Sequence, residues 1–380
     1  MSRRFLKSTA HQKAFLSGHV GGGKSTELRQ LIALPKINKA FFPILLDIEP
    51  GYLDTLDVAQ LLFLMSAAVM VYAKAHGLLS NRKLWDEPLQ ALDESLGGSG
   101  GTRLREHTFG VDVDLGVLKV KEELKFDEVR RQQFRELGAN RMFVLAQLLA
   151  GLIGDLLETA RKRNDLREPL LVIDGLDKVR VPQAQENTFR QKTSVLFEPP
   201  LRVVYTIPVG VAFHNCPKSI RDTLLHLYPA PTLKKAPGCF DPEQVPNSVG
   251  LDFLRKVLDT RVAPGIFDPA AVDMASMYSG GALRNFFWLL RAGIDLAESN
   301  NMRIVDTRVM RAAVKEARLS ESQSLHEEHY IKLAKVHQTN FLPDGDAVYL
   351  DQSWVFECFN DKLWYEANPL LWKVLDPGHQ

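Results

Sequence analysis

Residues 18–25, Gly-His-Val-Gly-Gly-Gly-Lys-Ser, constrain this chain more than any other segment. They match the pattern G-x-x-x-x-G-K-[ST], in which glycines let backbone N–H groups surround a phosphate without a side chain in the way. The short apolar run Ala14–Leu16 precedes them as a buried strand would, and a helical pattern follows from Ser25. The segment therefore predicts a strand–loop–helix unit that binds a nucleoside triphosphate.

The residue types in this loop predict separate tasks. Lys24 would reach the β- and γ-phosphates, and the Ser25 hydroxyl would ligate Mg²⁺. We expect the side chain of His19 to point outward and to have no catalytic task. The alternative interpretation of the segment is a glycine-rich turn with an exposed lysine. The expected nucleotide-binding residues are Gly18, Val20, Gly21, Gly22, Gly23, Lys24, Ser25 and Thr26.

The composition is that of an ordinary soluble protein with two or three domains: 380 residues, 45% hydrophobic, with a formal net charge of +1. This near-neutral balance gives no general argument for a nucleic-acid partner. Cys216, Cys239 and Cys358 lie far apart and include no C-x-x-C pair, so we expect reduced cysteines in a cytoplasmic protein. The apolar stretch 61–73 is too short to span a bilayer, so we expect a buried helix and no membrane partner.

Strand and helix patterns alternate in the first half, which predicts an α/β fold with a parallel sheet covered by helices in three layers. The expected strands are Lys13–Leu16, Phe41–Asp47, Leu170–Asp174, Arg202–Ile207 and His226–Ala230. The expected helices are Ser25–Ala33, Asp57–His76, Asp127–Arg161 and Gln183–Phe197. We also expect an insertion at about 97–165, which contains a β-hairpin that turns near Gly116.

A Pro/Gly-rich break at 229–238 separates this core from a helical region. The tail from residue 325 begins with a helix, and Asn360-Asp361 between two aromatic-rich runs predicts a hairpin turn. A helix followed by a hairpin is the order of a winged helix. The expected domains are a P-loop NTPase core at 1–235, an α-helical lid at 236–320 and a small winged-helix-like α+β domain at 321–380.

The segment 170–177, Leu-Leu-Val-Ile-Asp-Gly-Leu-Asp, is the second functional signal. Its four apolar residues predict a buried strand, and Asp174 stands at the carboxyl end, where α/β proteins form ligand sites. We expect Asp174 and Ser25 to hold Mg²⁺. We expect Asp177 to polarise the attacking water, with helix capping as the alternative role for this residue.

Three further residues are candidates because of their place in this pattern. Thr206 ends the next expected strand and would orient water near the γ-phosphate, unless it is an ordinary strand threonine. Arg284 follows the paired Gly280-Gly281 at a helix start and would reach back to the phosphates. Arg221 would serve a neighbouring subunit as an arginine finger, although a surface arginine is the simpler interpretation.

These motifs, in this order, resemble an AAA+ ATPase with a helical lid, close to the origin-recognition and STAND branches of P-loop proteins. Asp-Gly-Leu-Asp after four apolar residues is similar to the strand motif of NACHT-type STAND proteins. The resemblance implies ATP and Mg²⁺ as cofactors and hydrolysis of ATP to ADP and phosphate. It also implies a role for each motif residue: phosphate binding for Lys24 and Thr26, Mg²⁺ for Ser25 and Asp174, the catalytic acid for Asp177, and the first and second sensors for Thr206 and Arg284.

The chain departs from this pattern at three points. Lys178 follows Asp177, where NACHT-like motifs usually have a second acid, so we expect hydrolysis to be slow or stimulated by a partner. The loop begins 17 residues after Met1, so we expect few adenine contacts from the preceding segment. No effector domain or sensor repeat array is evident, so a partner chain would carry the effector or sensor.

Two classes of function compete. The preferred hypothesis is an ATP-driven switch or assembly factor that controls a partner protein in a signalling or defence complex, with homo-oligomers as a further expectation. The second is a DNA-binding AAA+ ATPase of initiator or transposition-regulator type. A nucleotide-bound structural subunit that does not hydrolyse ATP and a small-molecule kinase are weaker alternatives.

The tail bears on this choice through its charge. Residues 325–380 contain four lysines, no arginine and nine acidic residues, and this balance of −5 disfavours a nucleic-acid partner. We expect Trp354, Trp364 and Trp372 in the same tail to be exposed, which suits a protein contact, unless they are packing residues.

Overall fold

The computed structural model describes residues 11–48, 53, 56–80, 117–120, 139–213 and 216–379. The chain divides into two compact units. One consists of residues 1–17 and 24–225, and the other consists of residues 18–23 and 226–380. The second unit therefore contains the expected lid and the expected winged-helix-like region, together with most of the glycine-rich loop.

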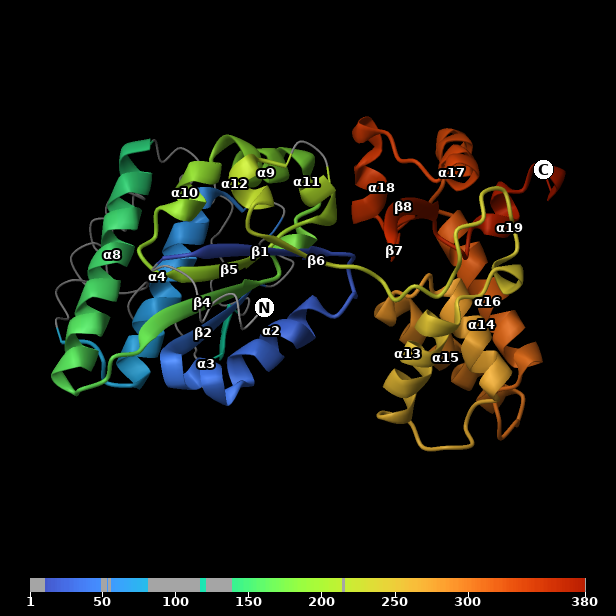
Figure 1. The fold of residues 1–380 in the computed structure, drawn as a ribbon, viewed down its shortest axis with the longest axis horizontal. Coiled ribbons are helices and arrows are strands. Elements are labelled where there is room, and N and C mark those ends of the chain that lie inside the picture. Colours follow the sequence, from blue (N-terminus) through green and yellow to red (C-terminus); the bar gives the residue numbers. More distant parts are fainter. Residues whose placement is uncertain are drawn as a thin grey trace. The chain divides into compact units, whose positions relative to one another are not determined.

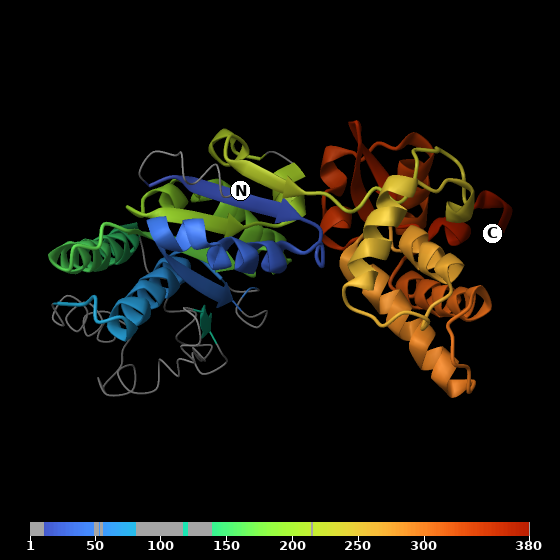
Figure 2. The same ribbon diagram turned by 60° about the horizontal axis from the view of Figure 1, so that its bottom comes forward.

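A six-stranded sheet forms the centre of the first unit (Figure 1). In space the strands follow the order β3, β2, β4, β5, β1, β6, and β1 to β5 pair in parallel. Figure 2 shows β1, in blue, beside β5, in green. β1, β4 and β5 are almost entirely buried, which explains their near-continuous apolar sequences. The strands are β1 (Lys13–Gly18), β2 (Phe41–Ile48), β3 (Val117–Val120), β4 (Glu168–Asp174), β5 (Arg202–Thr206) and β6 (Leu224–Leu227).

Helices follow the strands of this unit, as expected for parallel connections. α4 packs against β2 and α8, and the expected buried helix at 61–73 is confirmed because every residue of that stretch except Tyr72 is buried. Asp57 caps α4 by accepting a hydrogen bond from Gln60 N at 2.8 Å. The helices are α2 (Lys24–Ala33), α3 (Pro35–Ala40), α4 (Val58–Ala75), α8 (Ala139–Lys162), α9 (Pro182–Gln185), α10 (Thr193–Phe197), α11 (Val209–Phe213) and α12 (Lys218–Arg221).

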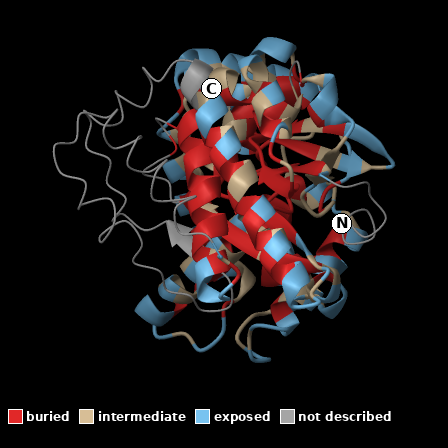
Figure 3. Ribbon diagram, turned by 90° about the vertical axis from the view of Figure 1, so that its left-hand side faces the viewer, coloured by how far each residue is buried: buried red, intermediate tan, exposed pale blue. Residues whose placement is uncertain are grey.

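By length and hydropathy alone, α4 and residues 142–162 of α8 are compatible with a membrane span. In α4, 78% of this stretch is already buried inside the protein. Packing against β2 and α8 thus accounts for the apolar sequence of α4. Figure 3 shows buried residues along the strands and central helices and exposed residues around them.

Three expectations differ from the structure. The strand expected at His226–Ala230 lies earlier in the chain, as β6 at Leu224–Leu227. The single helix expected at Gln183–Phe197 is interrupted by a π-helical turn at Glu186–Gln191. Directly after this turn, the Thr193 hydroxyl at the start of α10 donates to the Phe189 carbonyl within the turn. Val117–Val120 pairs in parallel with β2 at the sheet edge, whereas we expected it to be the second strand of a hairpin. The first strand of that hairpin and residues 127–138 of the expected helix lie outside the described residues.

The second unit contains a group of four helices, three of which have a side-chain cap at the N-terminus. Asn247, Asp268 and Asp306 accept backbone hydrogen bonds at three of these N-termini. The apolar faces of the four helices form one core, which also includes Leu370. The four are α13 (Ser248–Asp259), α14 (Pro269–Tyr278), α15 (Leu283–Ser299) and α16 (Thr307–Ser322).

The chain ends in a small α+β region with one long helix. The expected hairpin is confirmed: β7 and β8 are antiparallel and turn at Asn360-Asp361, where Asp361 has a φ of 65°. The elements are α17 (Glu327–Thr339), α18 (Val348–Asp351), β7 (Val355–Asn360), β8 (Lys362–Ala367) and α19 (Trp372–Leu375). The parallel sheet with its helices, the four-helix region and this α+β region confirm the expected fold class of a P-loop core, a helical lid and a winged-helix-like end.

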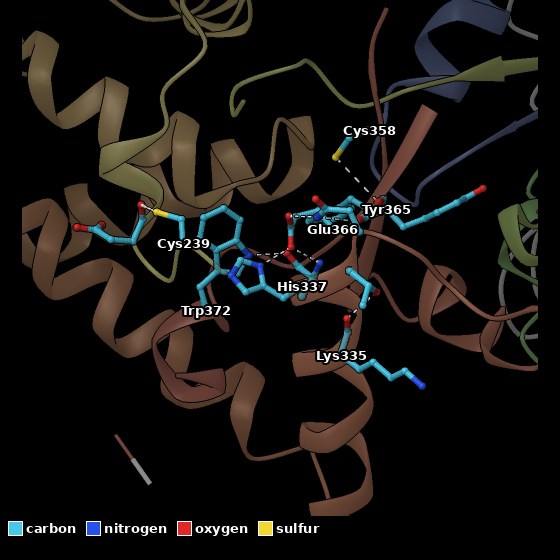
Figure 4. A network of polar contacts seen from close by, with 12 residues as sticks. Cys239, Lys335, His337, Cys358, Tyr365, Glu366 and Trp372 are labelled. Atoms are coloured by element: carbon cyan, nitrogen blue, oxygen red, sulfur yellow. Dashed lines mark hydrogen bonds and ion pairs between the residues drawn. The ribbon is translucent and has the colours of Figure 1, made fainter. Parts of the chain in front are cut away.

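A buried polar network holds α17, β8 and α19 together (Figure 4). His337 Nδ1 lies 2.6 Å from Glu366 Oε1, and Asn340 donates to the other carboxylate oxygen at 2.8 Å. Trp372 packs against His337 and donates its indole N–H to the Ala367 carbonyl. The expectation of exposed tryptophans is wrong for Trp364 and Trp372, which are 3% and 0% exposed, so the packing alternative fits both.

Candidate functional site

The order of the strands brings the candidate residues of the first unit to one edge of the sheet. β5 lies between β1 and β4, so the carboxyl ends of these three parallel strands meet there. Asp174 ends β4, Thr206 ends β5, and Lys24 and Ser25 begin α2. Residues far apart in sequence thus share one site because of the topology.

The central contact of this site is an ion pair between Lys24 and Asp177. Lys24 Nζ lies 2.8 Å from Asp177 Oδ2, and both side chains are buried. Asp177 Oδ1 has no hydrogen-bond partner among the described residues, and it is buried as well. The alternative of an exposed lysine in a glycine-rich turn does not fit, since Lys24 is only 4% exposed.

Gly175 explains how Asp177 reaches this position. It has a φ of 99°, and a Cβ there would lie 2.3 Å from the Ile48 carbonyl oxygen. Only glycine therefore lets the chain turn sharply after β4 into the short 3₁₀ helix Leu176–Lys178, which carries Asp177. The glycine of the Asp-Gly-Leu-Asp segment is thus required by the backbone conformation that places Asp177 in the site.

Ser25 and Asp174 are hydrogen-bond partners, and their chemistry suits a magnesium ion. Burial raises the pKa of Asp174, the Ser25 hydrogen bond opposes this, and the charges of Asp177 and Asp47 raise the pKa further. A magnesium ion would relieve this repulsion between carboxylates. No group of three His, Cys, Asp or Glu residues in the described ranges encloses a metal, but Mg²⁺ normally takes only one or two protein ligands beside phosphates and water.

Asp47 was missed by the sequence analysis. It pairs in register with Asp174 across β2 and β4, and Arg29 lies 3.4 Å from its carboxylate. Asp47 is the last residue of the strand expected at Phe41–Asp47, and an acid at the end of an apolar strand is also the pattern that identified Asp174. Only the strand order shows that the two ends are neighbours.

Two other candidates of the first unit have local partners. Thr206 is fully buried, and its hydroxyl donates to the Ile173 carbonyl at 3.2 Å, as an ordinary strand threonine would. Arg221 lies on α12 and donates to the Cys216 carbonyl at 3.0 Å. The roles of sensor and arginine finger stay predictions for these residues. Thr26 is exposed and Val20 is partly buried.

Most of the glycine-rich loop belongs to the second unit, where it contacts the start of α15. The Arg284 backbone N–H donates to the Gly21 carbonyl at 3.2 Å. Gly21 has a φ of 81°, and a Cβ there would lie 2.2 Å from the Arg284 Cβ. Arg284 thus lies against the loop, and Gly21 permits this close approach. The role of second sensor stays a prediction for Arg284.

His19 differs from the expectation of an outward-pointing side chain. It is 1% exposed, and Nε2 accepts a hydrogen bond from the Glu357 backbone N–H at 3.0 Å. Within the loop, the His19 carbonyl accepts a hydrogen bond from Gly22 N at 3.0 Å. The sequence held no signal for this contact because His19 and Glu357 are 338 positions apart.

No family model matches the chain, and no curated protein matches it. Among solved structures, it is similar to Cdc6p from Pyrobaculum aerophilum, with 16% identity over 98% of this chain and 88% of that one and a TM-score of 0.39. It is also similar to the Aeropyrum pernix ORC2 protein in ADPNP–ADP complexes, with 11% identity, the same coverage and a TM-score of 0.43. Drosophila ORC bound to DNA shows 15% identity over 96% of this chain and 81% of that chain, with a TM-score of 0.37. At these identities and TM-scores we take nothing about function from the likeness.

The site residues fit ATP and Mg²⁺ on their own chemistry. The described residues supply a buried ammonium at a helix start and a serine hydroxyl paired with a carboxylate, which are groups that could hold phosphate and magnesium. They also supply a carboxylate oxygen without a partner, which could accept a hydrogen bond from water.

Proposed function

We propose that this chain is an ATP-binding, Mg²⁺-dependent ATPase that acts as a nucleotide-driven switch. The observation that carries the proposal is the buried ion pair between Lys24 and Asp177. A buried ammonium is costly without an anion, and here the anion is the residue expected to assist catalysis. The triphosphate would compete with Asp177 for Lys24, so nucleotide binding and release of Asp177 would be coupled.

The roles of the residues follow from this geometry. Lys24 would bind phosphate oxygens, and Ser25 and Asp174 would hold Mg²⁺, which neutralises the charge of the phosphates when bound. Asp177, once separated from Lys24, would accept a hydrogen bond from the attacking water. Lys178 follows Asp177 and supplies no second acid, which supports slow or partner-stimulated hydrolysis.

The contact between the loop and α15 supports the switch. Gly21 and Arg284 touch through the backbone, and the Arg284 side chain lies against the glycine, so a ligand that rearranges the loop would change its contact with the helical region. A protein partner carrying the effector or sensor would read that change. Such a partner, self-association and a cytoplasmic location are parts of the proposal.

The burial of two acidic residues weakens the charge argument against the DNA-binding alternative. Two of the nine acids in residues 325–380, Glu357 and Glu366, are buried beside His226 and His337. The seven acids that are not buried and the four lysines give these residues a surface charge of −3. Repulsion of a phosphate backbone is therefore weaker than the sequence indicated, and DNA stays the second candidate ligand.

One experiment tests the proposal. ATP binding and turnover are measured for the wild type and Lys24→Ala with Mg²⁺, while the mass of the particle is followed by light scattering. Each measurement is made without additions and with duplex DNA, because DNA is the second candidate ligand. Binding of ATP to the wild type that is lost in Lys24→Ala supports the site. Equal binding by both proteins rejects it, and turnover only with DNA favours the second candidate.

A further inference from the structure

His19 ties the glycine-rich loop to the C-terminal hairpin within the second unit. Its Nε2 accepts the Glu357 N–H at 3.0 Å, and its ring meets the Phe356 ring edge-on, with centroids 5.1 Å apart. A phosphate loop binds its ligand mainly through backbone groups, lysine and serine. A buried histidine in this loop therefore makes a contact that phosphate binding does not need.

Glu357 is held from a second direction. Its Oε2 lies 2.8 Å from His226 Nε2, and both side chains are nearly buried. Its neighbour across the hairpin is Tyr365 on β8. The N–H that His19 accepts is thus fixed by a close side-chain contact and by strand pairing, so the hairpin offers the loop a rigid anchor.

The backbone carbonyl of His19 accepts a hydrogen bond from a donor in the loop. Its carbonyl accepts the Gly22 N–H at 3.0 Å, which closes a turn over residues 19–22. An N–H used in this turn is not available to a phosphate oxygen. His19 thus contacts β7 through its side chain and closes the turn through its carbonyl.

The contact between His19 and the hairpin affects the part of the loop that precedes Lys24. Residues 18–23 belong to the second unit, whereas β1 before them and Lys24 and Ser25 after them belong to the first. A contact that fixes residues 18–23 on the hairpin restricts how this part of the loop can adjust to a ligand.

We infer that His19 is a positioning residue that latches the glycine-rich loop to β7, so that release of the latch increases nucleotide affinity and nucleotide binding loosens the hairpin contact. By linkage, a partner that engages the hairpin and breaks the contact increases nucleotide affinity by the same factor. The affinity part of this inference rests on the proposed function. The contact between His19 and the hairpin does not.

The test compares the wild type with two substitutions of His19. His19→Phe keeps an aromatic ring against Phe356 but has no acceptor for the Glu357 N–H. His19→Gln keeps an acceptor and is expected to retain the latch. His76→Phe changes an exposed histidine of the first unit and is the matched control.

The first readout is amide hydrogen exchange in the full chain without nucleotide. In His19→Phe the Glu357 and Gly22 amides are expected to exchange faster by about tenfold or more, while the amides of α14 are unchanged. His19→Gln and the control are expected to match the wild type. Unchanged exchange at Glu357 and Gly22 in His19→Phe overturns the latch, whether or not the protein binds ATP.

The second readout is the dissociation constant for a fluorescent ATP analogue. We expect His19→Phe to bind on the order of 5- to 150-fold more tightly, the usual range of coupling between sites. Equal or weaker binding by His19→Phe overturns the inference. No binding by the wild type rejects the proposed function, and the exchange readout then decides the latch alone.

A second variant protects the test against misfolding. If His19→Phe does not fold, Phe356→Leu removes the edge contact with His19 from the hairpin side and leaves the Glu357 backbone in place. Tighter binding of the analogue by Phe356→Leu supports coupling through the hairpin. An unchanged dissociation constant together with faster exchange only in β7 shows a purely structural contact and rejects the inference.

Discussion

Lys24 and Asp177 form a buried ion pair in which the residue expected to bind phosphate is neutralised by the residue expected to assist hydrolysis. Under the proposed function, this ion pair must break before Lys24 can bind phosphate and before Asp177 can act on the attacking water. This relationship makes Asp177 the most informative single position in the first unit.

Asp177→Asn is expected to lower ATP turnover by about 100-fold or more, the usual loss when a general base is removed. The dissociation constant for ATP is expected to be unchanged or lower, because an uncharged amide competes less well for Lys24 than a carboxylate does. Steady-state turnover and equilibrium binding measure the two effects, with Asp295→Asn on the exposed face of α15 as control. Full turnover in the Asp177→Asn protein would reject the catalytic role and leave Asp177 only as the partner of Lys24, because it lies inside the 3₁₀ helix and caps no helix.

Thr206→Val separates the sensor role from the ordinary strand role. The valine removes the hydrogen bond to the Ile173 carbonyl, which costs about 1 kcal/mol of unfolding free energy. A sensor role predicts a fall in turnover of about tenfold or more at constant ATP affinity. Urea unfolding and turnover measured on the same sample check this. A stability loss with normal turnover assigns Thr206 to the strand alone.

Gly21→Ala tests the close approach of Arg284. Alanine is strained at a φ of 81°, and its Cβ would lie 2.2 Å from the Arg284 Cβ. We expect a loss of about 1–3 kcal/mol in unfolding free energy and loss of measurable ATP binding. Gly345→Ala is the control, because a Cβ there meets no atom within 4 Å. Equal melting temperatures of the two variants would contradict the observed contact.

Lys13 gives the unfolding free energy a specific pH dependence. Burial lowers the pKa of Lys13 from 10.5 to about 8, although its Nζ donates to the carbonyls of His11, Pro199 and Leu201. Between these two pKa values the unfolded chain keeps the proton that the folded chain has lost, so the unfolding free energy rises with pH in this window. Denaturant titrations at several pH values across the window are expected to show a steeper rise for the wild type than for Lys13→Met. Equal slopes of unfolding free energy against pH in the two proteins would contradict a lowered pKa for Lys13.

The His337–Glu366 pair anchors the C-terminal region, so the two substitutions of Glu366 are expected to differ in cost. Glu366→Ala leaves Asn340 and His337 without a buried partner and is expected to cost about 3–5 kcal/mol. Glu366→Gln keeps an acceptor oxygen and is expected to cost less. Urea unfolding followed by tryptophan fluorescence is suited to this comparison, because Trp372 packs on His337. A larger loss for the glutamine variant than for the alanine variant would contradict this arrangement.

Local chemistry made much of the first unit predictable. A glycine-rich loop between an apolar strand and a helix, and an apolar strand ending in Asp-Gly, are patterns of neighbouring residues, so the positions of β1, α2 and β4 followed from short-range spacing. The hairpin turn at Asn360-Asp361 was predictable for the same reason. The interruption of the helix after β4 was not, because the helical pattern of residues 183–197 gives no sign of the π-helical turn at Glu186–Gln191.

The sequence by itself determined which residues can bind phosphate and magnesium, because glycine, lysine, serine and aspartate carry that chemistry wherever the chain places them. Only the tertiary structure decided which of them meet. It placed β5 between β1 and β4, joined Asp47 to Asp174 across the sheet, and buried His19 against Glu357. These contacts join residues that are far apart in the chain, up to 338 positions, and strand order and core packing, which no local pattern encodes, determine them.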